Sequence, residues 1–296
     1  AASDVYKRQV DDGDLEQEME RLRQFSQGNR LRVAAADIVG AIPLMVVSDY
    51  LTEIAEVTLQ RVQADAWRDM LRKYGRPGGL AGMDTGFAII GYGKLGGIEL
   101  GYASDLDLVF LHGSADLNAM TDGPRSLADD VFYARMGQRV IHMLTTRMPS
   151  GVLYEADMRL RPNGNAGQLV SSLGAFEKYQ LNDAWVWEHQ ALVRARPVAG
   201  DPAMQARFMA IRHQVLCTER DPASLLDEVC SMRQKMRDRR KQRSVDANEW
   251  WAREREEVLR KDFSEDVYNM YADCLQYEKF RREFAEMWQP PEGFTL

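Results

Sequence analysis

The chain has 296 residues, of which 45% are hydrophobic and 28% are charged, a composition typical of globular proteins with enough apolar residues for a core of one or two domains. The formal net charge of −7 excludes a general basic surface for nucleic acid, so a polyanionic phosphate would need a local site or metal ions. No apolar run approaches the ~20 residues of a membrane span and no signal peptide precedes the first charges, so we expect a cytoplasmic protein without nucleic-acid or membrane partners.

The first part of the chain is expected to be helical. Residues 1–13 match nothing around them, and we expect a leader that does not belong to the fold. Residues 14–84 are expected to form a helical segment, with helices up to about Tyr74 and a glycine-rich turn at 75–79. The apolar positions that would form one stripe of this segment are Leu51, Ile54, Leu59, Val62 and Leu71.

Short apolar runs then predict strands. Two buried strands are expected at 87–90 and 106–111, and a third at 151–160 that ends in the turn Arg161-Pro162-Asn163-Gly164. A helix is expected between the second and third strands, from 126 to 148. The three segments together indicate a small α/β centre.

The rest of the chain reads as helical, from 173 to 238 and then through a charged, divergent tail at 239–296. The W-x-W-E-H segment is expected to be structural. Its tryptophans would be packing anchors and its charges would be partners of two arginines downstream, and the residues concerned are Trp185, Trp187, Glu188, His189, Arg194 and Arg196.

Cysteine and histidine do not form a recognisable framework. Cys217, Cys230 and Cys274 are widely spaced, which favours reduced, buried thiols over disulfides or a zinc ribbon. The four histidines are scattered as well, so we do not expect a tetrahedral metal site.

The stretch GYGKLGG, from Gly91 to Gly97, satisfies G-x-G-x-x-G, the pattern of dinucleotide-binding loops. A Rossmann unit needs a full helix after its glycines, and such connections take roughly ten to twelve residues. Here only residues 98–104 precede the next strand. A P-loop needs G-x-x-x-x-G-K-[ST], whereas Lys94 is followed by Leu95. The sequence therefore argues against both loops.

Two aspartates, Asp105 and Asp107, mark the start of the second buried strand, and an extended backbone points both to the same side. Adjacent carboxylates repel each other unless a cation lies between them, and Mg²⁺ takes oxygen ligands while keeping positions for phosphate. Such a pair is more often a solvated edge or a turn cap. The glycine turn before it and the buried strand after it favour metal-assisted phosphoryl or nucleotidyl transfer.

At these residues the sequence resembles the nucleotidyltransferase superfamily that includes DNA polymerase beta, and more narrowly the glutamine synthetase adenylyltransferase family. The resemblance covers about residues 14–237 and is carried by LRVAAADI, GYGKLGGIELGYASDLDLVF, VLYEADMRLRPNGNAGQLVSS and AWVWEHQALVRARPVAGD. It implies an α+β fold in which a small mixed-sheet, polymerase-beta-like core at 85–172 is flanked by helical segments. GYGKLGG with SDLDL is more similar to the C-terminal, adenylylating half of that bifunctional family than to the half that removes AMP.

The resemblance also implies roles for particular residues. Asp105, Asp107 and Asp157 would be catalytic and would bind two Mg²⁺ ions. ATP would be bound by Gly93, Lys94, Gly96, Gly97, Ser104, Arg159 and Arg161. For the two arginines, a pair of surface salt bridges is an equally good explanation.

The implied reaction transfers AMP from ATP to a tyrosine of glutamine synthetase and releases pyrophosphate. The implied partners are glutamine synthetase and a PII-type signalling protein. Two alternatives stay open: phosphorolytic removal of AMP from modified glutamine synthetase, and an inactive nucleotide-binding or scaffolding fragment. The last has support after Arg237, where an expected segment of the type G-x-x-D-I-E-F is missing from the sequence.

Overall fold

The computed structural model describes residues 15–80, 82–114, 116, 119–219, 221, 225–235 and 237–238. Contacts divide the chain into two units, 1–221 and 222–296. All elements named below belong to the first unit; in the second, 225–235 is helical. The expected leader, the expected tail and Cys274 lie outside the described residues.

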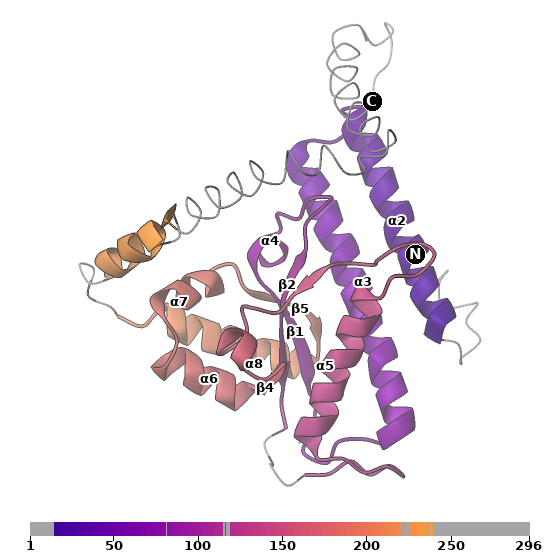
Figure 1. Ribbon diagram of the computed structural model, residues 1–296, viewed down its shortest axis with the longest axis vertical. Coiled ribbons are helices and arrows are strands. Elements are labelled where there is room, and N and C mark those ends of the chain that lie inside the picture. Colours follow the sequence, from indigo (N-terminus) through magenta and orange to yellow (C-terminus); the bar gives the residue numbers. More distant parts are fainter. Residues whose placement is uncertain are drawn as a thin grey trace, which may run out of the picture. The chain divides into compact units, whose positions relative to one another are not determined.

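Two long helices open the described chain. α2 (Leu15–Ile38) and α3 (Leu44–Tyr74) pack against each other along their lengths (Figure 1). A turn at Val39 and Gly40 ends the first helix and Pro43 caps the second, because proline supplies no N–H but fits the start of a helix. The helical prediction for this segment is confirmed. None of the described helices is long and apolar enough to cross a membrane.

The predicted stripe on α3 faces the core in large part. Leu51, Leu59 and Val62 are buried, whereas Ile54 and Leu71 are half-buried.

Five strands of the described residues form one sheet, which is small and mixed as expected. They are β1 (Phe87–Gly91), β2 (Leu106–His112), β3 (Ala156–Asp157), β4 (Val170–Ser172) and β5 (Arg196–Gly200). β1 is antiparallel to both β2 and β5. β3 and β4 run parallel to β2 and follow one another along its other edge. The two strands predicted first, at 87–90 and 106–111, are confirmed.

Helices cover both faces of this sheet. The helices after β2 are α5 (Asp129–Thr145), α6 (Leu173–Asn182), α7 (Val186–Leu192) and α8 (Pro202–Leu216). Ile89 and Phe110 pack on the side of α2, α3 and α5, while Ile90 and Val109 pack on the side of α6, α7 and α8 (Figure 1). Alternate residues of a strand point to opposite faces, so continuous apolar runs fit strands that are buried on both sides.

The strand expected at 151–160 is wrong except at two residues, Ala156 and Asp157. The N–H groups of Leu153 and Tyr154 both donate to the carbonyl of Leu144 in α5, each at 3.2 Å. The chain therefore bonds first to a helix, and only briefly to β2. The turn at 161–164 is confirmed by the left-handed φ angles of Asn163 and Gly164, +60° and +54°.

The segment 173–238 contains a strand that the sequence analysis missed. β5 reads RPVAG and pairs with β1, with a register irregularity between Ile89 and Ile90. Proline and glycine are poor strand formers, but β5 lies at the edge of the sheet, where a missing N–H is tolerated. The helix expected at 126–148 is shorter, at Asp129–Thr145.

The W-x-W-E-H segment has different partners from those expected. Trp185 is 68% exposed, so it is not a packing anchor. Glu188 accepts hydrogen bonds from the Tyr179 hydroxyl at 2.9 Å and from the Trp185 N–H at 2.9 Å, which is the structural role expected of it. It does not pair with Arg194 or Arg196, which bind other carboxylates described below. The expectation of buried thiols is also wrong for Cys217 and Cys230, which are exposed.

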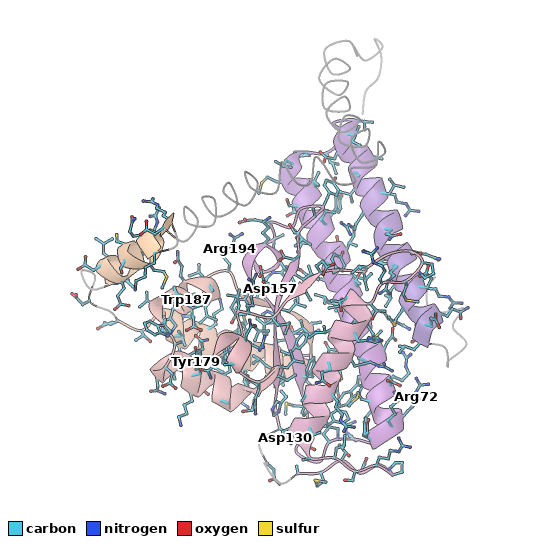
Figure 2. The ribbon with its side chains drawn as sticks, viewed as in Figure 1. Arg72, Asp130, Asp157, Tyr179, Trp187 and Arg194 are labelled. Atoms are coloured by element: carbon cyan, nitrogen blue, oxygen red, sulfur yellow. The ribbon has the colours of Figure 1, made fainter. Side chains whose placement is uncertain are left out.

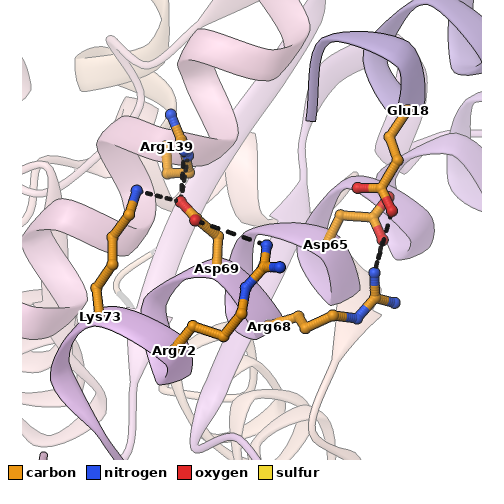
Figure 3. A network of polar contacts seen from close by, with 7 residues as sticks. All are labelled: Glu18, Asp65, Arg68, Asp69, Arg72, Lys73 and Arg139. Atoms are coloured by element: carbon orange, nitrogen blue, oxygen red, sulfur yellow. Dashed lines mark hydrogen bonds and ion pairs between the residues drawn. The ribbon is translucent and has the colours of Figure 1, made fainter. Parts of the chain in front are cut away.

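An ionic cluster ties α3 to its neighbours (Figure 3). The carboxylate of Asp69 accepts hydrogen bonds from Lys73 at 2.8 Å and from Arg139 of α5 at 2.9 Å, and Arg72 lies 3.9 Å away. Burial raises the pKa of Asp69, but the hydrogen bonds from Lys73 and Arg139 outweigh it, and the net pKa lies below its ordinary value. Removing one cation from this cluster would leave a poorly solvated carboxylate.

His112 is a buried histidine at the end of β2. Its ring stacks on Tyr133 with centroids 4.8 Å apart, and its Nδ1 has no hydrogen-bond partner within the described part of the chain. Burial lowers the pKa of His112 from 6.5 to about 4, although Asp129 and Asp130 oppose the change. The folded state therefore holds His112 neutral at a pH where the unfolded chain takes up a proton.

His112 predicts an acid lability of the fold. Between pH 6.5 and about 4 the unfolded chain binds more protons than the folded chain. The free energy of unfolding therefore decreases as the pH is lowered through this range, by about 2 to 3 kcal/mol at pH 4.5 relative to neutral pH. His112→Phe keeps a ring against Tyr133 and removes the titration. Urea unfolding at about pH 7 and about pH 4.5 should show a smaller loss for the variant. Equal losses in both proteins would contradict the assignment.

Candidate active site

The glycine turn leads from β1 into a single helical turn, α4 (Gly93–Gly96). Gly93 has a φ of +53°, and a Cβ atom there would lie 2.2 Å from Oδ2 of Asp107. Only glycine therefore lets the Asp107 carboxylate lie directly against the turn. The N–H of Tyr92 donates to the backbone carbonyl of Asp107 at 2.9 Å and fixes the turn to β2.

The three predicted acids lie on two neighbouring strands or directly before them. Asp105 is exposed just before β2, Asp107 is half-buried in it, and Asp157 is the parallel-strand partner of Asp107 in β3. Burial raises the pKa of Asp107, and the negative charges of Asp105 and Asp157 raise it further, against Arg159 and Lys94. The site thus carries an excess of negative charge, as a cation site would. No helix occupies the spacer 98–104.

Arg159 forms an ion pair with one of these acids, Asp157. Its Nε donates to Oδ1 and Oδ2 of Asp157 at 2.9 and 2.7 Å, and its Nη2 also binds Oδ2. Hydrogen bonds from Arg159 lower the pKa of Asp157, although burial opposes the change. Among the residues that the structure describes, no three acidic, histidine or cysteine side chains are arranged to hold a metal ion. The donor set fits a divalent cation in chemistry and charge, but Asp157 would first have to leave Arg159.

Lys94 and Ser104 lie near the acids. The Lys94 Nζ is 3.5 Å from Oγ of Ser104, and that oxygen accepts the Gly101 N–H at 3.0 Å. Between them, Ile98 has a φ of +57°, an unfavourable conformation for a β-branched residue. Such outliers persist where the surrounding structure enforces them, and they cluster at functional sites.

Gly96 and Gly97 pack against Arg194, which lies just before β5. A Cβ on Gly96 would be 1.8 Å from the carbonyl oxygen of Arg194, and one on Gly97 would be 2.7 Å from its guanidinium. Gly96 therefore requires glycine for packing, because its clash is with the main chain, whereas at Gly97 the flexible Arg194 side chain can move aside. Arg194 forms an ion pair with Glu99.

Arg196 is a supporting residue that the sequence analysis did not assign to the site. Its Nε and Nη2 each donate at 3.1 Å, to the carbonyls of Gly96 and Leu95, and Nη2 also pairs with Glu56 of α3. These bonds satisfy the end of α4, where the last carbonyls lack partners inside the helix. No local pattern reveals this contact, because Arg196 and Glu56 are 140 residues apart.

Arg161 holds its own loop. Its guanidinium donates to the carbonyls of Met158 at 2.7 Å, Gly167 at 3.4 Å and Asn165 at 3.4 Å. Arg159 forms a salt bridge, with Asp157, whereas Arg161 binds backbone carbonyls. A phosphate-binding role for either arginine stays a prediction.

The structure therefore brings together a glycine turn, a lysine and three acids at one end of a small mixed sheet. Figure 2 labels one of these acids, Asp157. Backbone N–H groups in such turns and acidic side chains with a divalent cation are the means by which proteins bind nucleotide phosphates. This fold and arrangement are compatible with a nucleotidyltransferase-like core.

Comparison with known proteins identifies the family. The sequence profile of glutamate-ammonia ligase adenylyltransferase matches residues 1–211. A "bifunctional glutamine synthetase adenylyltransferase/adenylyl-removing enzyme" of Hahella chejuensis is 56% identical over 230 residues, which are 77% of this chain and 24% of that protein. The protein of the same name from Methylococcus capsulatus is 57% identical over 228 residues, 76% and 24% of the two chains. The chain belongs to the glutamate-ammonia ligase adenylyltransferase family, and it spans about a quarter of the length of these relatives.

Proposed function

We propose that this chain carries a polymerase-beta-like adenylyltransferase site that transfers AMP from ATP to a tyrosine of glutamine synthetase, in the cytoplasm, with release of pyrophosphate. The observation that carries the proposal is the grouping of Asp105, Asp107 and Asp157 beside the Gly93 turn. The proposal is supported by two relatives whose name includes this activity. A PII-type partner stays a prediction of the family resemblance.

The residues of the site suit this reaction. A phenol has a pKa near 10, so the attacking tyrosine needs activation at neutral pH. Two Mg²⁺ ions held by the three aspartates would lower that pKa and neutralise charge on the triphosphate. Asp157, once released from Arg159, would accept the phenol proton. Lys94 and the N–H groups of the glycine turn would hold the leaving pyrophosphate.

The direct test uses ATP labelled in its α-phosphate, purified unmodified glutamine synthetase and Mg²⁺. We expect label to appear on a tyrosine of glutamine synthetase and pyrophosphate to be released. A parallel reaction supplies orthophosphate and adenylylated glutamine synthetase, because the relatives' name includes removal of AMP. Label release there, without labelling in the first reaction, would assign the opposite direction. No reaction in either assay would favour the scaffolding alternative.

A further inference from the structure

Asp157 is held entirely by Arg159 in this structure. Besides the three guanidinium bonds, the backbone N–H of Arg159 donates to Oδ1 of Asp157 at 2.8 Å. Both carboxylate oxygens thus accept bonds from one residue two positions away. A carboxylate gripped in this way offers few free lone pairs to a metal ion.

The ion pair between Arg159 and Asp157 joins an exposed side chain to a shielded one. The Arg159 side chain is 73% exposed, and its guanidinium bonds to no other group within the described ranges, whereas the side chain of Asp157 is only 14% exposed. Releasing Arg159 therefore breaks a surface contact and leaves packing intact. The carboxylate of Asp157 is largely shielded from water, so its charge stays compensated only if another cation takes the place of Arg159.

Arg159 also lies within reach of the other acids. Its guanidinium is bonded to Asp157, which is the strand partner of Asp107, and Asp105 precedes Asp107 by two residues. Arg159 and Lys94 thus compensate only part of the charge of three carboxylates. A divalent cation would compensate more of that charge, and a nucleotide would bring phosphates, to which a guanidinium binds in bidentate fashion.

We propose that Arg159 is a positioning residue that holds Asp157 until divalent cations enter the site, and that it then exchanges Asp157 for the phosphates of the bound nucleotide. The inference rests on the proposed function, since it assumes that Asp157 is a metal ligand. The neighbouring arginine cannot take this part without opening the 158–167 loop, because Arg161 is bound to three backbone carbonyls.

Metal binding without nucleotide tests the first half of the exchange. Mn²⁺ accepts the same oxygen ligands as Mg²⁺, and its free concentration can be followed by electron paramagnetic resonance. Arg159→Gln removes the competitor, so we expect Mn²⁺ to bind about fivefold more tightly than to the wild type. Equal or weaker binding by the variant would overturn the proposal.

Nucleotide binding tests the second half and should change in the opposite direction. With Mn²⁺ saturating, Arg159→Gln should bind ATP about fivefold more weakly in calorimetry, because a phosphate ligand is lost. Arg159→Lys keeps the positive charge but loses the bidentate geometry of the guanidinium. Its affinities for Mn²⁺ and for ATP should lie between those of the wild type and Arg159→Gln. Unchanged ATP affinity in Arg159→Gln would overturn the exchange, since a merely structural role would not move the two affinities in opposite directions.

Two further variants separate this inference from the proposed function. Arg135→Gln removes one exposed cation from α5, where it contacts Tyr74, and should leave both affinities unchanged. The double variant Asp105→Asn with Asp107→Asn lacks two of the proposed metal ligands and gives the baseline for Mn²⁺ binding. If the wild type and Arg159→Gln bind no more Mn²⁺ than this double variant, the metal site and the exchange are both wrong. If both bind Mn²⁺ equally well, only the exchange is wrong.

Discussion

Replacing Asp105 and Asp107 together by asparagine is expected to abolish AMP transfer to glutamine synthetase while leaving the chain folded. The amides keep the size of the side chains but remove two of the three negative charges that would attract divalent cations. Charge stabilisation by a metal ion contributes several kcal/mol to such reactions, so the rate should fall by at least about a thousandfold. The labelled-ATP assay measures it directly.

The same variant should be at least as stable as the wild type when no divalent cation is present. Burial and the neighbouring acids raise the pKa of Asp107, which means that its ionised form is disfavoured in the folded state at neutral pH. Asparagine removes that unfavourable charge. We expect the thermal unfolding midpoint, measured in the presence of a chelator, to stay constant or to rise. A lower midpoint would mean that activity is lost because the variant unfolds.

Asp130→Asn is a matched control. Asp130 is an exposed aspartate in the first turn of α5, far from Asp157 in Figure 2, and its Oδ1 accepts the adjacent N–H of Val131. The substitution changes charge by one unit without touching the acids of the site, so transfer should persist. Near-normal labelling by the Asp105 and Asp107 variant would remove the metal-binding assignment.

The parts of the site that are close in sequence could be predicted from it. The buried runs of β1 and β2 are continuous and apolar, and the spacer between them is too short for a crossover helix. Those two facts place Asp105 and Asp107 beside the glycine turn without any structure. The third acid is different: a single aspartate in an alternating segment carries no signal, and only the family resemblance pointed to Asp157.

The strand expected at 151–160 shows why alternation can mislead. Leu153, Tyr154 and Met158 are buried in the same core as α2, α3 and α5, although strand alternation would point the neighbours Leu153 and Tyr154 to opposite faces. The backbone of this segment bonds to the end of α5, and only Ala156 and Asp157 pair with β2. Apolar residues indicate that a segment is buried, but the partner of its backbone is decided by tertiary contacts.

Long-range support of the site was beyond sequence reasoning. Arg196 crosses 100 residues to reach the Gly96 carbonyl and 140 residues to reach Glu56, and nothing in RARPVAG distinguishes these contacts from surface charge pairs. The strand β5 was missed for a related reason, because its proline and glycine argue locally against a strand. The grip of Arg159 on Asp157 is a choice of side-chain conformation, and a sequence pattern cannot specify it.

Gly96→Ala is expected to destabilise the fold by about 3 kcal/mol or more, because the added methyl group meets main-chain atoms on two sides. A Cβ there would lie 1.8 Å from the carbonyl oxygen of Arg194 and 2.5 Å from that of Gly91. No side-chain rotation relieves a clash with the backbone, so α4 and the entry to β5 would have to separate. That movement would also break the bonds from Arg196 to α4 and shift the turn that lies against Asp107.

The measurement is the thermal midpoint, which should fall by roughly 6 to 12 °C if unfolding of the first unit is two-state. Gly174→Ala is the matched control: it lies in the first turn of α6, and a Cβ there has nothing within 4 Å. Alanine reduces the entropy of the unfolded chain without steric cost at such a position, so this variant should be neutral or slightly stabilised. A similar midpoint for both variants would mean that α4 and the entry to β5 are not packed as closely as the structure has them. In that case the turn would also lack the rigid support that places Asp107 beside Asp157.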